Sequence, residues 1–478
     1  MYDAYVTDAS SRSPVLTVVA LCFGGLCAAL TQTLVIPIQS ELPRLLSTSA
    51  ANASWVVTIT LLAAAVTMPV SGRLADLYGK QRILVVSAAV LVVGSLVCAL
   101  SSTLAPMLLG RALQGLAMGF IPVGISLMRE VTPPSMTSTA VAAMSATLGV
   151  GGAIGLPLSA WIVEVGDWHA LFWVATVAAA LVLVAVVVVV PHVHDRHDGR
   201  VDLVGASGLA VGLVAALVGV SKANEWGWTS GRTLGAIAGG LVVLVLWGAH
   251  QLHRSDPLVD LRATAKPAVL LTNVAAVAVG FGMMAQAIVM PQLLQMPRAT
   301  GYGLGQTILE AGLWMAPGGL MMMLFAPVSS RLMGSLGAKI TLAIGAVVLG
   351  AGYVVATVLM DAPWQLLVAT VIASSGVGIG YAAMPTLILD ASPQREAAAA
   401  VGLNALSRSV GTTVASAVMA AVLTSQTLSL GGVAVPTQGA FRWCFVIGAI
   451  AAFVGAALAL LIPVASRRTV EPEAVAAR

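Results

Sequence analysis

The chain has 478 residues, of which 59% are hydrophobic and only 9% are charged, and its formal net charge is +4. Soluble proteins carry roughly 25% charged residues, so this composition excludes a soluble globular enzyme and a disordered chain. It also argues against an outer-membrane barrel, whose alternating strands are only weakly apolar as a sequence. The sequence therefore predicts a helical protein that crosses a membrane many times.

Fourteen stretches are apolar over the roughly 20 residues that a helix needs to cross a bilayer. The first is too long for a signal peptide and lacks its basic front end, so it counts as a span. We expect an all-α polytopic membrane protein, and the even number of spans places both termini on one side. The predicted spans are 15–38, 52–72, 83–101, 104–127, 138–163, 169–191, 201–221, 232–252, 267–291, 308–330, 340–360, 364–388, 398–423 and 441–464.

Lys and Arg residues are distributed unevenly between the two sides of the predicted membrane. Sixteen lie in loops and tails on the side of the N-terminus, and five lie on the other side. Because cytoplasmic loops carry an excess of Lys and Arg, both termini are predicted to be cytoplasmic. The mild positive charge thus reports topology, and we expect no nucleic-acid partner. Two further arginines, Arg111 and Arg408, fall inside predicted spans.

Two pairs of segments repeat at nearly the same spacing. The sequence at 130–152 resembles that at 390–412, an offset of 260, and GRLADLYGK at 72–80 resembles SRLMGSLGA at 330–338, an offset of 258. Such repetition implies two homologous six-span halves, and transporters built from repeats bind substrate between them. The predicted units are a six-helix bundle at 1–191, two inserted spans with inner loops at 192–266, a second six-helix bundle at 267–464 and a cytoplasmic tail at 465–478.

Three motifs carry a family resemblance. GRLADLYGKQR at 72–82, RALQG at 111–115 and GVGGAIGLPLSA at 149–160 resemble the loop signature, the proton-antiporter motif and the glycine-rich antiporter motif of the major facilitator superfamily. With the second span at 53–74, they resemble fourteen-span drug:proton antiporters of the EmrB/QacA type. The resemblance implies the major facilitator fold, with two six-helix bundles plus two extra transmembrane helices, and a transporter rather than an enzyme.

The sequence departs from that family at two acidic positions. Thr31 stands where the family usually has an aspartate near the outer end of span 1, and Gly334 stands opposite Asp76 in the second copy of the loop. Because the first acid is replaced, we expect neutral or weakly charged substrates more than dications.

The loop and span 5 motifs predict gating residues. A carboxylate on the loop after span 2 can cap a helix N-terminus or pair with an arginine of a neighbouring helix, and such contacts can hold the cytoplasmic ends together in one state. Glycines in span 5 allow close helix approach, and a proline can bend the helix. The alternative for the loop is an ordinary positive inner loop. The predicted gating residues are Gly72, Asp76, Gly79, Lys80, Arg82, Gly151, Gly155 and Pro157.

Proton coupling is predicted at Glu310, Arg111 and Asp76. The resemblance implies that Arg111 assists proton transfer, since a fixed cation helps a nearby carboxyl group to release its proton. The alternative is a structural arginine satisfied by backbone carbonyls and Gln114. Glu310 begins span 10, where a half-buried carboxyl group could alternate between protonated and ionised forms. A wet interfacial glutamate without a role explains it equally well.

Polar, aromatic and methionine side chains in the spans predict a substrate cavity between the halves. Methionine suits adaptable apolar pockets, although packing or lipid contact also explains any single methionine. Arg408 is either a structural anchor of the second half or a contact for a substrate with negative character, and the sequence leaves both open. The predicted substrate-binding residues are Thr31, Gln32, Trp55, Gln114, Asn273, Gln286, Trp314, Met322, Asn404 and Arg408.

Two loops contain residue types that bind metals. PHVHDRHD at 191–198 has three histidines, and Asp256 and Asp260 resemble the spaced aspartates that hold magnesium diphosphate in membrane prenyl transferases. Solvated polar loops explain both, and the four cysteines have no metal-ligand spacing. We expect no metal site and no cofactor.

Together these patterns predict a proton-coupled efflux transporter in a bacterial cytoplasmic membrane. It would export hydrophobic or amphipathic small molecules, such as drugs or secondary metabolites, by alternating access. The sequence has no nucleotide-binding motif, so the proton gradient is the expected energy source, and we expect a monomer in the lipid bilayer. The alternatives are a dedicated exporter of one metabolite or lipid, a proton-coupled uptake symporter, and a non-transporting membrane sensor or integral membrane enzyme.

Overall fold

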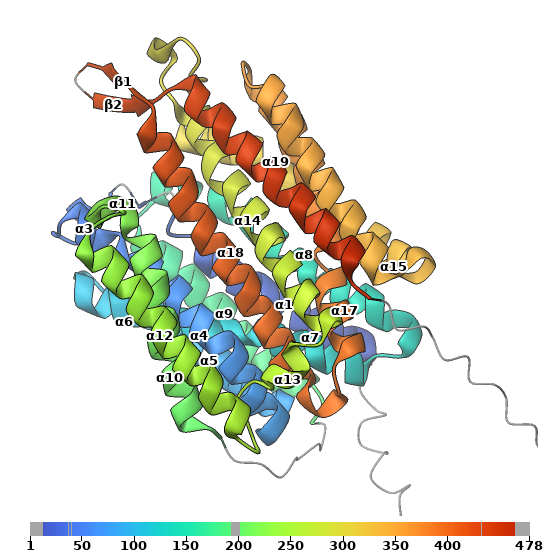
Figure 1. Ribbon diagram of the computed structural model, residues 1–478. Coiled ribbons are helices and arrows are strands. Elements are labelled where there is room, and N and C mark those ends of the chain that lie inside the picture. The colour runs from blue at the N-terminus through green and yellow to red at the C-terminus, as the bar shows by residue number, and fades with distance from the viewer. Residues whose placement is uncertain (1–12, 37, 40, 193–200, 432, 464–478) are drawn as a thin grey trace, which may run out of the picture.

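The computed structural model describes residues 13–36, 38–39, 41–192, 201–431 and 433–463. In this part of the chain, long helices run side by side through the whole molecule (Figure 1). The all-α polytopic fold predicted from the sequence is therefore confirmed.

The first half of the chain forms one bundle of long helices with two short helices between the first two. The helix after α5 is interrupted by a turn of 3-10 helix, so it appears as two segments. The elements are α1 (Pro14–Thr33), α2 (Leu42–Leu45), α3 (Ala50–Ala53), α4 (Trp55–Tyr78), α5 (Lys80–Ala99), α6 (Leu104–Leu116), η2 (Ala117–Gly119), α7 (Phe120–Val131), α8 (Pro134–Val165) and α9 (His169–Val189).

The second half forms a second bundle and follows the inserted helices. The inserted elements are α10 (Leu203–Ser221), α11 (Ala223–Trp226), α12 (Gly231–His253) and α13 (Leu261–Thr264). The second bundle contains α14 (Pro267–Gln295), η3 (Arg298–Thr300), α15 (Ile308–Val358), α16 (Pro363–Gly380), α17 (Ala383–Ala391), η4 (Gln394–Glu396), α18 (Ala397–Ser425), the strands β1 (Thr427–Leu430) and β2 (Val433–Pro436), and α19 (Gln438–Leu461).

Thirteen helices among the described residues are long and apolar enough to cross a membrane, whereas the sequence predicts fourteen spans. The difference lies in α15, which has 51 residues. It is about 75 Å long at 1.5 Å per residue, more than twice a hydrocarbon core of about 30 Å. Gly337 breaks it with φ 83° and ψ 161°, so α15 makes two crossings and the fourteen predicted passes are present.

The break in α15 has a counterpart in the first half. Gly79, 258 residues earlier, ends α4 and precedes α5 with φ 99° and ψ 133°. Glycine adopts such positive φ values without the steric penalty that a side chain brings. The same sharp turn thus occurs at the same place in both copies of the repeated loop.

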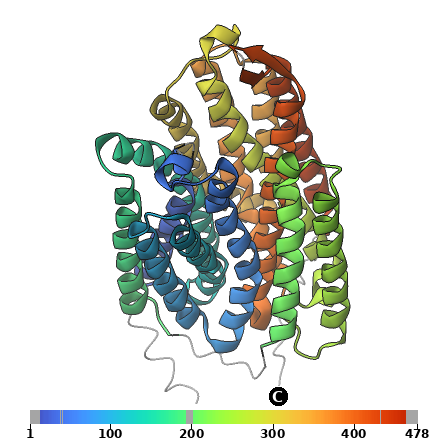
Figure 2. The same ribbon diagram turned by 90° about the vertical axis from the view of Figure 1, so that its left-hand side faces the viewer.

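The long helices end at two opposite faces of the molecule. The termini face is the end where α1 begins and α19 ends, and the hairpin face is the opposite end, which carries β1 and β2 (Figure 2). The two strands pair antiparallel, from Thr427 opposite Pro436 to Leu430 opposite Val433. This small hairpin has no counterpart in the sequence prediction, because four-residue strands beside a long apolar helix leave little periodic signal.

The inserted helices pack against one side of the molecule, where the two halves meet. Leu209, Leu213 and Leu217 of α10 join a buried cluster with Leu62 of α4 and Leu406 of α18. The partner helix α12 is mostly exposed, as expected for a helix whose outer surface faces lipid. The inserted pair therefore touches both halves through α10.

Asp202 ties the two inserted helices together. Its carboxylate accepts from Gly205 N of α10 at 2.9 Å and from Gln251 Nε2 of α12 at 2.8 Å, and His250 Nε2 lies 3.2 Å away. Burial raises the pKa of Asp202, but these hydrogen bonds outweigh it and hold the pKa below its usual value. The acid therefore stays ionised at neutral pH as an N-cap of α10.

Candidate functional site

A cavity of about 750 Å³ lies between the two halves. Its walls come from α1 and α8 of the first half and from α14, α15 and α16 of the second half. It reaches the hairpin face, because Gln39, Ser54, Gln295 and Ile308 lie at helix ends on that face and line it. The volume falls in the range of small-molecule sites.

The cavity lining is apolar with neutral hydrogen-bonding groups. Among the described residues, none of its side chains is ionisable. The polar lining residues are Thr33, Gln39, Ser54, Gln286, Gln292, Gln295, Thr370 and Ser374, and the methionines are Met283, Met315 and Met322. Such a lining suits uncharged amphipathic groups, since it offers no ion partner.

Met322 of α15 lies at the inner part of the cavity, pressed against α8. A Cβ atom added to Gly149 would lie 2.2 Å from Met322 Sδ, a distance that real contacts do not allow. Gln286 Nε2 donates to Ser374 Oγ at 3.0 Å on the same wall. Of the predicted substrate-binding residues, Gln286 and Met322 are the two that line this cavity.

The termini face is closed below the cavity by a contact that we call the first latch, formed by Gly72 and Asp76 of α4 with Ala398 and Ala399 of α18. Asp76 Oδ1 accepts from Ala398 N at 3.2 Å and Oδ2 accepts from Ala399 N at 2.9 Å. Asp76 is only 4% exposed. The carboxylate thus binds the free amides at the N-terminus of α18, where the helix dipole also favours a negative charge.

Further polar contacts surround the first latch. Lys80 Nζ lies 3.8 Å from Asp76 Oδ1 and forms an ion pair with Glu130 at the end of α7. Arg129 donates to the carbonyl of Leu389, at the end of α17 in the other half. Arg82, also predicted to gate, is exposed. The two halves are therefore joined at the termini face by more than one carboxylate contact.

The repeated loop of the second half makes a related contact, the second latch, formed by Ser330 of α15 with Ser138 and Thr139 of α8. Ser330 Oγ lies 3.1 Å from Ser138 Oγ and 2.8 Å from Thr139 Oγ1. These residues match the first latch at the offsets of 258 and 260. Gly334 stands in the place of Asp76, and a Cβ atom there would meet nothing within 4 Å.

Arg111 is 1% exposed and holds three helices of the first half together. Its Nε donates to Val56 O at 3.0 Å, and its Nη1 donates to Thr31 O and to Gln114 Oε1, both at 2.8 Å. Gln114 Nε2 donates in turn to Ser95 Oγ at 3.0 Å. This geometry favours the structural alternative for Arg111, with its charge directed at carbonyl groups.

Four residues form a buried polar cluster in the second half, which we call the Arg408 cluster: Asn273, Tyr381, Asn404 and Arg408. Arg408 donates to Tyr381 and Asn404, and Asn404 donates to Asn273. The sequence reasoning missed Tyr381. Its signal is a tyrosine in the middle of an otherwise apolar span, where a hydroxyl group needs a partner.

Glu310 and two tryptophans take up local positions near the hairpin face. Glu310 is exposed, and its Oε2 accepts from Thr307 N at 2.8 Å in a capping box that starts α15. Trp314 Nε1 donates to Gln306 Oε1 at 2.9 Å. Trp55 lies under Lys222 Nζ, 5.0 Å from the ring centroid. The exposure of Glu310 favours the wet interfacial alternative.

The remaining predicted residues of α1 and α8 pack against each other. A Cβ atom on Gly151 would lie 2.4 Å from Ala29 Cβ, and one on Gly155 would lie 1.9 Å from Thr33 Oγ1. Pro157 lies inside α8 without ending it, and Gln32 is half-buried. The glycines therefore permit the close approach of these two helices.

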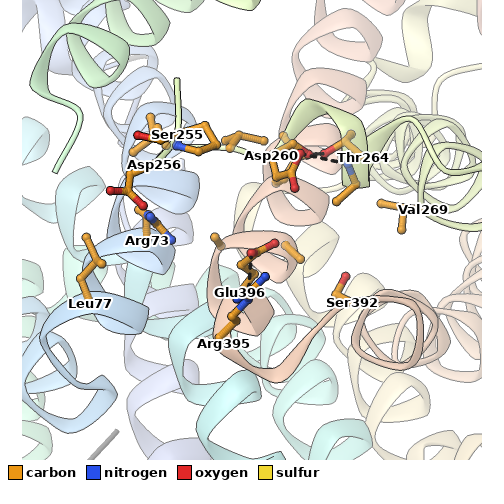
Figure 3. A pocket seen from close by; sticks show the side chains of 17 residues that line it. Arg73, Leu77, Ser255, Asp256, Asp260, Thr264, Val269, Ser392, Arg395 and Glu396 are labelled. Atoms are coloured by element: carbon orange, nitrogen blue, oxygen red, sulfur yellow. Dashed lines mark hydrogen bonds and ion pairs between the residues drawn. The ribbon is translucent and has the colours of Figure 1, made fainter. Parts of the chain in front are cut away.

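A second pocket, of about 330 Å³, lies at the termini face beside the first latch (Figure 3). Arg73 and Arg395 line it together with Asp256, Asp260 and Glu396. Asp260 caps α13 by accepting from the backbone N of the next turn. Ala399 also lines this pocket, so the connector after α12 lies near the first latch.

The described residues contain no group of three or more His, Cys, Asp or Glu that could hold a metal ion. The predicted loop at 191–198 lies outside the described residues except for its first two positions.

Comparisons with known proteins place these features in a family. A sequence model of the Major Facilitator Superfamily matches residues 21–416 and 272–477. The chain is 25% identical over 342 residues to the uncharacterized MFS-type transporter YhcA of Bacillus subtilis, and the match covers 71% of this chain and 63% of YhcA. The chain thus spans less than two thirds of that relative.

Two other proteins extend the comparison. The tetracenomycin C resistance and export protein of Streptomyces glaucescens is 25% identical over 426 residues, which are 86% of this chain and 76% of that protein. The crystal structure of the human organic anion transporter MFSD10 (TETRAN) superposes with a TM-score of 0.65 at 15% identity and covers 94% of this chain and 100% of that one. The latter similarity establishes the fold alone.

Proposed function

Because the chain belongs to the Major Facilitator Superfamily, we propose that this multi-pass membrane protein is a proton-coupled efflux transporter of hydrophobic or amphipathic small molecules. Family membership makes it a transporter and not an enzyme. The export direction is supported by the similarity to the tetracenomycin C resistance and export protein of Streptomyces glaucescens. The proposal needs no cofactor and no ATP, and it treats the monomer as the working unit.

The observation that carries the proposal is the one-sided cavity between the halves. It reaches the hairpin face, while the first latch closes the termini face. In the proposed cycle, the two halves rock so that the latch opens as the hairpin face closes. The excess of Lys and Arg on the side of the termini supports a cytoplasmic termini face in a bacterial cytoplasmic membrane, which makes the described state outward-open.

Asp76 is the acid that we propose to link protons to this cycle. Its carboxylate bonds across the two halves, whereas Glu310 is exposed at the hairpin face. A protonated carboxyl group is a weaker acceptor for backbone amides. Proton binding at Asp76 would therefore weaken the first latch and favour opening of the termini face. In this scheme Arg111 supports the first half, and Glu310 remains the alternative proton site.

The test is proton movement in proteoliposomes that hold a pH gradient and contain no ATP. Neutral, cationic and anionic lipophilic compounds are added in turn, and collapse of the gradient is followed by a trapped pH dye. We expect some neutral or weakly charged compounds to collapse it, and Asp76→Asn to abolish the effect. Glu310→Gln is compared with Glu164→Gln, a matched exposed glutamate at the end of α8.

The outcomes separate the proposed roles. Loss of coupling in Glu310→Gln but not in Asp76→Asn would move the proton site to the hairpin face. If folded wild-type protein moves the compounds but no protons, the coupling part of the proposal fails and a facilitated exporter remains.

A further inference from the structure

The Arg408 cluster is held together by hydrogen bonds between neutral partners and one cation. Arg408 Nε donates to Tyr381 OH at 2.9 Å and Nη1 donates to Asn404 Oδ1 at 2.6 Å. The guanidinium carbon lies 4.6 Å from the centroid of the Tyr381 ring. Asn404 Nδ2 donates to Asn273 Oδ1 at 3.0 Å. Three separate segments, α14, the α16–α17 junction and α18, thus converge on one positive charge.

The cluster lacks an anion. Arg408 is 6% exposed, and no carboxylate lies within ion-pair distance of it among the described residues. A buried charge without a counter-ion is unfavourable by several kcal/mol. Beside it, Asn273 is also 6% exposed, and its Nδ2 has no hydrogen-bond partner in the part of the chain that the structure describes. Tyr381 OH already accepts from Arg408, so its own proton is free to be donated.

The cluster lies between the cavity and the first latch. Tyr381 is four residues, about one helical turn, beyond Val377, which lines the cavity. In the other direction, Ala399 of the first latch is nine residues from Arg408 along α18, about 14 Å. The cluster is therefore below the cavity, on the side that opens when the latch separates.

The helix that carries Tyr381 is also interrupted there. α16 ends at Gly380 and α17 begins at Ala383. The related helix of the first half is interrupted by η2 at Ala117–Gly119. Broken helices at corresponding places in two repeats are typical of binding sites in transporters, because a helix break exposes polar backbone groups.

We infer that the Arg408 cluster binds one singly charged oxygen group of the transported molecule, a carboxylate, phenolate or enolate. This inference rests on the proposed transport function. A single guanidinium neutralises a single negative charge and donates in a planar fork to such an oxygen group. The neutral cavity above it accepts the apolar remainder of the molecule. The substrates are then amphipathic weak acids, and the bound substrate supplies the counter-ion that Arg408 lacks.

The test measures binding to the full chain in lipid nanodiscs, without a gradient. The probes are 4-butylbenzoate and its uncharged counterpart 4-butylbenzamide, which differ in charge but little in shape. Wild-type protein should bind the benzoate at least tenfold more tightly than the benzamide. Arg408→Gln should remove this preference while leaving benzamide affinity within about twofold, and Asn273→Leu should reduce it. Arg442→Gln, which removes an exposed arginine at the hairpin face, is the matched charge control and should retain the preference.

Three results would overturn the inference. The first is equal affinity of the wild-type protein for the two probes, and the second is a preference for the benzoate that persists in Arg408→Gln. The third is a higher melting temperature in chloride than in gluconate that depends on Arg408, with no binding of the benzoate; this would identify a site for a free halide ion. If size-exclusion chromatography and melting show that Arg408→Gln is not folded, Arg408→Lys is used instead. It keeps the positive charge and should show a weaker preference for the benzoate than the wild type. Failure of proton-coupled efflux would instead appear as absent gradient-driven flux with the binding preference intact.

Discussion

The two latches at the termini face are built on the same repeated loop but hold the halves with different chemistry. Both loops turn at a glycine with positive φ, Gly79 in one and Gly337 in the other. The first latch places a buried carboxylate on the N-terminus of α18. The second latch has hydroxyl contacts and an empty space beside Gly334. The first latch therefore depends on one ionisable group, whereas the second latch contains none.

The largest change is expected from removing that group. Asp76→Ala deletes two charge-assisted hydrogen bonds, which are worth about 1.5 kcal/mol each at the lower end of their range. A total of about 3 kcal/mol shifts the equilibrium between closed and open termini faces by roughly 100-fold. Spin labels at Ser135 and Gln394, exposed residues of opposite halves, should report a longer distance. An unchanged distance distribution would show that Arg129 and the second latch suffice for closure.

A smaller effect on stability is expected from Asp202, because it caps a helix within the inserted pair, whereas Asp76 joins the two halves. Asp202→Ala should lower stability by about 1 kcal/mol, as loss of an N-cap does, without changing the label distance. Because the pKa of Asp202 is depressed in the folded protein, its contribution is full above the unfolded pKa of about 3.9 and is lost as pH falls through the lower folded pKa. Melting of wild type and variant should therefore differ at pH 7 and converge in strong acid.

Adding the missing acid to the second latch should act in the opposite direction to Asp76→Ala. Gly334→Asp places a carboxylate near the N-terminus of α8, where such a charge is worth about 0.5–1 kcal/mol. The ratio of molecules with a closed termini face to molecules with an open one should rise a few-fold, so the short label distance should become more populated. Transport should slow. Gly334→Ala is the control for the added Cβ atom, which has free space. If Gly334→Asp and Gly334→Ala give the same label distances, a carboxylate at position 334 does not bind the N-terminus of α8.

The smallest effect is expected from the hydroxyl contacts themselves. Ser330→Ala removes the bonds to Ser138 and Thr139, and such partly exposed neutral bonds contribute about 0.5 kcal/mol net. The equilibrium should change by about twofold, measured with the same labels. A change as large as that of Asp76→Ala would make the two latches equivalent and end the distinction between them.

Hydrophobic length was enough to predict the all-α polytopic fold, and internal repetition singled out the loop that carries Asp76, because these signals are local in the sequence. The rotation of each helix is not local. The sequence predicts Thr31, Trp55 and Gln114 in the cavity. In the structure, Gln114 accepts from Arg111, Thr31 Oγ1 donates to Ala28 O of its own helix, and Trp55 faces Lys222. Conversely, the cavity lining contributed by Thr33 and by Gln292 and Gln295 of α14 depends on packing between helices, which a single sequence does not reveal.

The glycines of the seam between α4 and α18 have a consequence for speed. A Cβ atom on Gly72 would lie 2.3 Å from Ala398 O, and one on Gly402 would lie 2.3 Å from Met68 O. At these two glycines the halves thus meet backbone to backbone. Under the proposed cycle, the seam can part and re-form without any rotamer change at these positions. The hydrogen bonds of the first latch then contribute to the kinetic barrier together with the Arg129 contact and the second latch. Substitutions at Asp76 should therefore change the rate of the cycle without changing the lining of the cavity.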